Sequence, residues 1–307
     1  MKIKEVRRIW DQAPHNAFTD LVRHKDRWWC VFREGKGHVS DHGKLRVITS
    51  PDSVTWESAA LLTSATEDLR DAKLTTAPDG RFLLYGAGVD KRKKPQVLRS
   101  YVWTSDDGHR WSKGRAIGTV NDWLWRVTLH EGAYYSVGYG CGEVWRGVGK
   151  NTCRLYKSAD GVTFEPMVDP FRSGDYSNES AIVFRPDKTA LCLLRRDPDN
   201  GLLGTSAPPY TQWKWLDVGC RIGGPHMLLL PDGRLLAAVR LYDRKTRTSL
   251  CWIDAGTGKL TEALKLPSGG DTSYAGLVLH GGLLWVSYYS SHEKKTCIYL
   301  AVVEFGT

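Results

Sequence analysis

Three arginines occupy the same position in a sequence unit that recurs along the chain. In segments 27–33, 189–195 and 234–240, Arg33, Arg195 and Arg240 each stand six residues after the first residue of a strand-like run. A guanidinium group is a planar fork that binds both oxygens of a carboxylate, and converging guanidinium groups repel one another unless an anion lies between them. Each arginine alone is typical of a solvated strand end, but three at one register predict a receptor for an anionic ligand.

The unit that carries these arginines is a strand, a tight turn and a second strand. Its clearest copy is segment 71–84, in which Pro78-Asp79-Gly80 separates two apolar runs, and similar turns recur at 186–188 and 231–233. Such turns between short apolar runs are typical of β-hairpins. Six units of roughly 45 to 55 residues are typical of propeller blades.

We therefore expect an all-β chain in which residues 1–307 form one six-bladed β-propeller domain. The blades are expected to begin near residues 18, 70, 123, 178, 223 and 272. The last blade lacks a fourth strand of its own. We expect residues 3–9 to supply it, because pairing the two ends of the chain leaves no open sheet edge.

A second repeated element is a Ser-x-Asp turn with an aromatic residue four places after the aspartate. It occurs at 50–56, 105–111 and 158–164. The aspartate can accept backbone hydrogen bonds across the turn, and the aromatic ring can pack over the outer strands. A calcium loop would need several more oxygen ligands, so we expect a structural role and no metal.

The composition limits the classes of partner. The chain has 43 Lys+Arg against 34 Asp+Glu, a net charge of +9, which is compatible with a nucleic acid, an anionic substrate or a soluble surface. The only dense cationic run, at 91–94, is typical of a solvated loop, so we expect no nucleic-acid partner. The seven cysteines lack zinc-site spacing and are expected to be reduced. No stretch approaches the roughly 18 apolar residues of a membrane span, and no signal peptide is visible, so we expect no membrane partner and a cytoplasmic location unless a leader was removed.

The repeats, the turns and the arginines together resemble the sialidase (neuraminidase) superfamily along the whole chain. That resemblance implies a six-bladed propeller with an arginine triad from the first, fourth and fifth blades. Two features depart from the family pattern. The Ser-x-Asp turns are one residue shorter than usual, and segment 32–35 reads Phe-Arg-Glu-Gly where sialidases commonly have Phe-Arg-Ile-Pro.

The resemblance also implies a catalytic base and a nucleophile. Glu179 stands sixteen residues before Arg195, where the family has its base, and Tyr274 opens the last blade, where the family has its nucleophilic tyrosine. A neutral phenol approaches an anomeric carbon that bears a carboxylate without the repulsion that Asp or Glu would suffer. Its reference pKa is about 10, so a nearby carboxylate must take its proton. The alternatives are an ordinary strand aromatic for Tyr274 and a structural partner of Arg195 for Glu179.

The general acid has two candidates. Asp41 lies in the loop before the third strand of the first blade, where the family has its acid, although the loop is shorter than usual. Asp71 stands at the same offset from its turn as the base does, and it is either the acid or a partner of Arg70. His38 and His42 are further candidates for the acid or for contacts with the leaving group.

Two further side chains, Arg126 and His226, are expected to line the funnel and contact the substrate, together with tryptophans 123 and 125, which core packing would equally explain. The leading hypothesis is a retaining exo-glycosidase that removes a terminal sialic acid or related acidic sugar, with no metal or organic cofactor. The alternatives are a non-catalytic glycan-binding propeller and a hydrolase or lyase acting on a polysaccharide that contains uronic acid. The sequence does not specify the sugar, its linkage, whether configuration is retained or inverted, or the oligomeric state.

Overall fold

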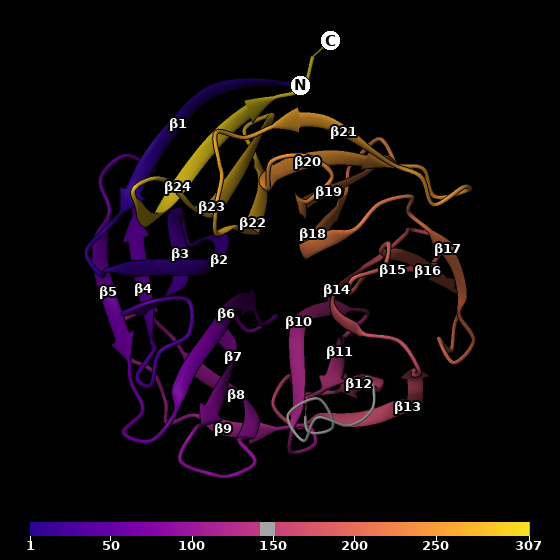
Figure 1. Cartoon of the computed structure of the whole chain (residues 1–307), viewed down its shortest axis with the longest axis horizontal. Helices are drawn as coiled ribbons and strands as arrows, with labels where there is room; N and C mark the ends of the chain where they lie inside the picture. Colours follow the sequence, from indigo (N-terminus) through magenta and orange to yellow (C-terminus); the bar gives the residue numbers. More distant parts are fainter. Residues whose placement is uncertain (142–150, 307) are drawn as a thin grey trace.

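The chain folds into six blades arranged around a central axis (Figure 1), of which the sixth and the first are joined into one eight-stranded sheet. The structure is a computed structural model that describes residues 1–141 and 151–306. Within these residues there are strands and turns but no helix. The predicted all-β, six-bladed β-propeller is confirmed.

The first five blades are each built from four consecutive strands, and the sixth from the last three strands together with β1 (Lys2–Trp10). The first three blades contain β2 (His15–His24), β3 (Arg27–Gly35), β4 (Lys44–Ser50) and β5 (Glu57–Leu62); β6 (Asp68–Thr76), β7 (Phe82–Asp90), β8 (Val97–Ser105) and β9 (Arg115–Ile117); and β10 (Asp122–His130), β11 (Ala133–Gly140), β12 (Cys153–Ser158) and β13 (Glu165–Arg172). The last three contain β14 (Ser177–Phe184), β15 (Ala190–Arg196), β16 (Leu202–Ser206) and β17 (Lys214–Asp217); β18 (Ile222–Leu229), β19 (Leu235–Leu241), β20 (Arg247–Ile253) and β21 (Leu260–Lys265); and β22 (Thr272–His280), β23 (Leu283–Glu293) and β24 (Lys295–Glu304).

The sixth blade is completed by the N-terminal strand. β1 (Lys2–Trp10) pairs antiparallel with β24, so the indigo and yellow ends of the chain lie side by side in Figure 1. A parallel bridge between His15 and Thr296 also joins this blade to the first. The pairing covers the edge of β24, which would otherwise present unpaired backbone groups.

Burial explains why the second strand of each blade reads as a continuous apolar run. All residues of β7 are buried, because this strand is covered on both faces by the neighbouring blades. By contrast, half of the residues of β5 and of β13 at the rim are exposed.

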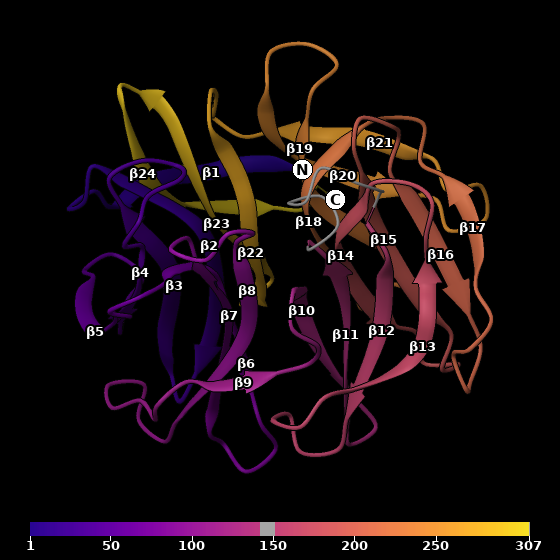
Figure 2. The same ribbon diagram turned by 60° about the horizontal axis from the view of Figure 1, so that its bottom comes forward.

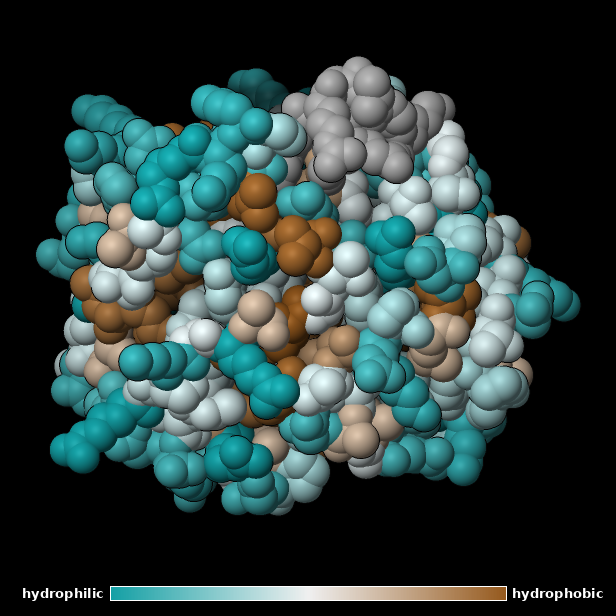
Figure 3. Space-filling view, turned by 90° about the horizontal axis from the view of Figure 1, so that it is seen from below, coloured by the Kyte–Doolittle hydropathy of each residue, from teal (hydrophilic) through white to brown (hydrophobic). Residues whose placement is uncertain are grey.

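Figure 2 shows these twisted sheets obliquely, with loops at both faces of the ring. The side of the ring seen in Figure 3 is mostly hydrophilic, with separate apolar patches. Among the described residues, no helix is long and apolar enough to span a membrane.

The Ser-x-Asp turns are closed by their aspartates. In the first of them Asp52 Oδ1 accepts hydrogen bonds from the backbone N–H groups of Val54 and Thr55, each at 2.8 Å. Asp107 and Asp160 make the equivalent pairs of bonds in the second and third turns. These bonds satisfy backbone donors at the rim, which is the structural role expected of the turns.

The inner strand of every blade contains a register shift at the same level. The shifts fall between residues 17 and 20, 70 and 73, 124 and 127, 177 and 180, 223 and 226, and 273 and 276. At four of these bulges the backbone adopts a positive φ: at Phe18, at Asp71, at Gly224, and at both Ser273 and Tyr274. A β-bulge re-aims a side chain. The repeated bulge is therefore the device that positions the candidate functional groups.

Candidate functional site

Tyr274 and Glu179 are in direct contact, although 95 residues separate them in the sequence. The Tyr274 hydroxyl donates a hydrogen bond of 2.6 Å to Glu179 Oε1, and the two residues are only 7% and 6% exposed. Burial, and then the Glu179 carboxylate, raise the pKa of Tyr274 well above its ordinary value, while Arg195 and Arg240 oppose the shift. The phenol therefore stays neutral until its proton is removed, and Glu179 is placed to remove it.

Gly224 makes this contact possible. A Cβ atom at this position would lie 2.8 Å from the ring of Tyr274, and the φ of Gly224 is +55°. Its N–H donates a 2.8 Å hydrogen bond to Glu179 Oε2. The glycine at the bulge of the fifth blade thus admits the tyrosine ring and also orients the carboxylate.

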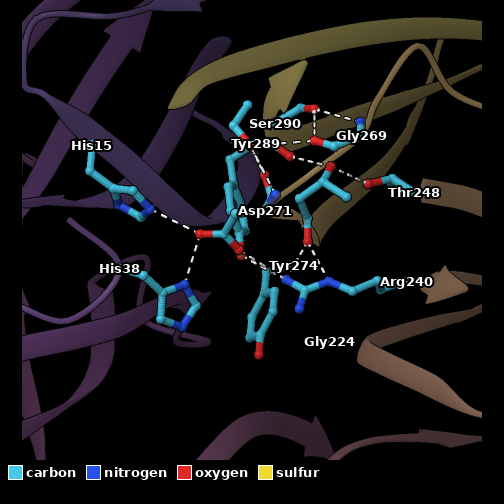
Figure 4. A network of polar contacts seen from close by, with 12 residues as sticks. His15, His38, Gly224, Arg240, Thr248, Gly269, Asp271, Tyr274, Tyr289 and Ser290 are labelled. Atoms are coloured by element: carbon cyan, nitrogen blue, oxygen red, sulfur yellow. Dashed lines mark hydrogen bonds and ion pairs between the residues drawn. The ribbon is translucent and has the colours of Figure 1, made fainter. Parts of the chain in front are cut away.

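Arg195 and Arg240 lie beside the tyrosine. Arg195 Nη1 is 2.8 Å from Glu179 Oε2 and 3.3 Å from Tyr274 Oη, and the Arg240 guanidinium carbon is 5.2 Å from the centre of the Tyr274 ring. Arg240 Nη2 donates to the Tyr289 hydroxyl and Nε to the Thr272 carbonyl, and Figure 4 shows Arg240 between Asp271 and Gly224. Among the described residues no hydrogen bond engages Arg195 Nη2 or Arg240 Nη1, so each arginine retains a donor for a ligand.

Arg33 does not join them, which corrects the expectation of three converging arginines. Its side chain and that of Asp68 are both 0% exposed, and its Nε and Nη2 donate to Asp68 Oδ1 at 3.1 and 2.7 Å. Nη1 donates to the Gly37 carbonyl and Nη2 also to Ser40 Oγ. Four of its five N–H groups are thus engaged by its own blade and the next, and the side chain has no exposed surface, so Arg33 is not accessible to a substrate.

Arg70 takes a place at the rim of the site. Its guanidinium lies 5.4 Å from the centre of the Phe18 ring, and the Phe18 ring is 5.1 Å from that of Tyr274. Its Nη2 donates to the carbonyl of His38, while its buried Nε has no partner in the part of the chain that the structure describes. Arg70 is therefore the third arginine that the structure brings toward Tyr274.

The two candidate acids have opposite surroundings. The Asp41 side chain is 80% exposed, and its neighbour is Lys91 at 3.7 Å. Asp71 is 5% exposed, and its Oδ1 is buried without a hydrogen-bond partner among the described residues. Burial raises the pKa of Asp71, and the nearby Glu179 adds to this, whereas Arg70 and Lys73 lower it. Of the two, Asp71 has the environment that favours a protonated carboxylic acid.

Arg126 lies within the bulge of the third blade, and His226 ends the bulge of the fifth. With Asp20 and neighbouring strand residues they line a cavity of about 320 Å³ toward the other end of the inner strands. Arg126 Nη1 is 3.0 Å from Asp20 Oδ1, and His226 Nδ1 is 3.0 Å from the Ala275 carbonyl oxygen. Burial, and then Arg126, lower the pKa of His226 well below its ordinary value. Both side chains are engaged within the protein, so the expectation that they contact the substrate in the funnel is not supported by their positions.

A network around Asp271 was missed at the level of sequence. Asp271 Oδ2 lies 2.9 Å from His15 Nε2 and 2.7 Å from His38 Nδ1, and Oδ1 accepts a 2.8 Å hydrogen bond from the Tyr289 hydroxyl (Figure 4). Burial alone would raise the pKa of Asp271, but the hydrogen bonds from the two histidines hold it far below its ordinary value. The sequence does place Asp271 just before the last inner strand and His15 at the start of the first. In a closed ring these two blades are neighbours, so the two positions could have suggested the contact.

Comparison with known proteins identifies related folds. No known protein family and no curated protein matches the sequence. A Dyadobacter fermentans protein of unknown function is 20% identical with a TM-score of 0.87, and a Penicillium chrysogenum α-L-arabinanase is 12% identical with a TM-score of 0.74; each alignment covers 99% of both chains. The Trypanosoma rangeli sialidase is 11% identical with a TM-score of 0.70 over 94% of this chain and 55% of that protein. At these identities the similarity shows a shared six-bladed propeller fold.

Proposed function

We propose that this protein is a glycoside hydrolase that removes a terminal acidic sugar of the sialic acid class from a glycan. The observation that carries the proposal is the 2.6 Å hydrogen bond between the Tyr274 hydroxyl and Glu179, with Arg195 and Arg240 beside it. A phenol paired with a carboxylate and flanked by cations suits a substrate whose reacting carbon bears a negative charge.

The substrate carboxylate would be held by the arginines. Arg195 Nη2 and Arg240 Nη1 would supply the donors, since both arginines lie beside Tyr274, and Arg70 lies over the Phe18 ring. Arginine is suited to this role because its donors match the spacing of carboxylate oxygens. Arg33 does not take part, because its donors are bound to Asp68 and to the loop that follows β3.

The chemistry follows from the contacts of Tyr274. Its hydroxyl oxygen attacks the anomeric carbon while its proton moves to Glu179, and the bond to the leaving oxygen breaks as Asp71 donates a proton to that oxygen. The product of this step is a tyrosyl glycoside. Water then attacks the same carbon, Asp71 takes the water proton, and the proton on Glu179 returns to the tyrosine. Two displacements give net retention of configuration.

The fold supports a carbohydrate substrate. Two proteins that share the propeller are a sialidase and an α-L-arabinanase, and both act on sugars. The pair of Tyr274 and Glu179 and the free arginine donors favour the acidic sugar of the first over the neutral sugar of the second. This assignment makes a small acidic sugar or a sialoglycan the partner of the site.

The test is hydrolysis of an aryl α-sialoside by the purified protein. We expect release of the aryl alcohol by the wild type, a loss of at least about 100-fold in kcat for Tyr274→Phe, and no change for Tyr288→Phe. Tyr288 is a matched control, because it is a buried tyrosine on β23 whose hydroxyl bonds the Pro267 carbonyl. Undiminished release of the aryl alcohol by Tyr274→Phe would show that Tyr274 is not the nucleophile.

Two other outcomes would redirect the assignment. Tight binding of free sialic acid without release of the aryl alcohol would indicate a glycan-binding propeller. If the protein neither releases the aryl alcohol nor binds sialic acid but cleaves a polyuronate, its substrate is a uronic acid. The absorbance of an unsaturated product would then distinguish elimination from hydrolysis.

A further inference from the structure

We propose that His15, His38 and Asp271 form a binding site for a divalent transition-metal ion, with Zn²⁺ as the ion that it suits best. One nitrogen of each histidine and one oxygen of the aspartate lie within 4.8 Å of one another. Ligand atoms about 2.1 Å from one ion lie at most roughly 4.2 Å apart, so a small rotation of the half-exposed His38 brings all three to a common ion. Two imidazoles and one carboxylate are a ligand set for zinc and its first-row neighbours.

The arrangement of the carboxylate favours a cation. Both histidines direct a ring nitrogen at the same oxygen, Asp271 Oδ2, at 2.9 and 2.7 Å. Without an ion, each imidazole must carry a proton on that nitrogen to make the contact, whereas an ion at this point takes lone pairs from all three groups. The other oxygen, Oδ1, is bound by the Tyr289 hydroxyl and lies 3.4 Å from Arg240. Its orientation is thereby set, as outer partners orient a ligand in metal sites.

Packing orients the His15 ring before any ion arrives, whereas the half-exposed His38 can still rotate. His15 is 7% exposed and packs against Phe18 and Tyr289, with ring centres 6.2 and 6.4 Å away. The His38 ring is nearly perpendicular to that of Phe18, with ring centres 5.1 Å apart. A ligand that is fixed by packing loses little entropy when the ion binds.

The three ligands come from separate parts of the propeller. His15 begins β2, His38 belongs to the loop that covers Arg33, and Asp271 precedes β22 (Figure 4). An ion here would tie this loop to the first and sixth blades beside Tyr274. Because the His38 side chain is 48% exposed, the remaining coordination positions face solvent and can accept water or a sugar hydroxyl.

The test measures metal rather than catalysis, so it is independent of the proposed hydrolysis. The full chain is purified without a histidine tag, stripped with a chelator and titrated with Zn²⁺ in competition with a chromophoric chelator. Co²⁺ is then added as a spectroscopic probe of the ligand field. The variants are His38→Ala and Asp271→Asn, and His42→Ala is the matched control, since it removes an exposed histidine from the same loop.

We expect the wild type and His42→Ala to bind one equivalent of Zn²⁺ with equal affinity. His38→Ala and Asp271→Asn should each bind at least about 100-fold more weakly and lose the Co²⁺ absorption bands. Equal affinity in the wild type and His38→Ala, or less than stoichiometric binding by the wild type, would overturn the proposal. His38 is half-exposed, so its replacement is compatible with folding and keeps the test decisive.

Discussion

The buried pair of Arg33 and Asp68 should control the stability of the first blade without contributing to substrate binding. Both side chains are 0% exposed, and Asp68 Oδ1 accepts two bonds from Arg33 and one from the Gly43 N–H. Breaking a buried ion pair from one side costs about 3–5 kcal/mol. In Asp68→Asn the amide oxygen can keep part of these bonds, and Lys91, 3.5 Å away, loses a partner, so we expect a loss of about 3 kcal/mol.

Thermal unfolding provides the assay. At about 2 °C per kcal/mol for a chain of this size, Asp68→Asn should lower Tm by about 6 °C. Asp41→Asn is the control, because its side chain is 80% exposed and its contact with Lys91 is worth less than about 1 kcal/mol. If Arg33 were a substrate ligand, Asp68→Asn would free it. A lower KM for the aryl sialoside with an unchanged Tm would therefore refute the structural role.

Three further predictions follow from the surroundings of individual groups. Arg195→Met should raise KM for the aryl sialoside roughly 10- to 100-fold, because it removes a charged hydrogen-bond donor, whereas Arg196→Met, whose Nε bonds the Asn200 carbonyl, should leave KM unchanged in the same steady-state assay. Asp71→Asn should lower kcat and abolish the decline of kcat with rising pH, since the acid must be protonated and burial raises its pKa; a pH–rate profile with the basic limb intact would contradict this. Burial lowers the pKa of Lys73 to about 8 from an unfolded value near 10.5, so the wild type should gain stability as the pH rises from 8 to 10.5, in total about 3 kcal/mol. Urea unfolding of Lys73→Met should lack that gain, and an equal gain in both proteins would contradict the shift.

Repetition made the architecture readable from the sequence. Hairpin turns such as Pro78-Asp79-Gly80 and apolar second strands such as β7 are local patterns, and their recurrence predicts blades without knowledge of any contact. The same count from each turn put Arg195 and Arg240 at one level of the ring. The resemblance to sialidases singled out Glu179 and Tyr274, and the structure joins these two by a hydrogen bond.

Only the tertiary structure decided which of these groups are free to act. Arg33 stands at the same register as Arg195. Its guanidinium, however, is bound by Asp68, which lies 35 residues away at the start of the next blade, and is therefore withdrawn from the site. Asp71 and Asp41 were both candidates for the acid, and the structure separates them by burial and by the charged neighbours of Asp71. Register is a local property that a repeat preserves. The partner of a buried charge is set by whichever neighbouring element reaches it, and that is decided when the blades pack together.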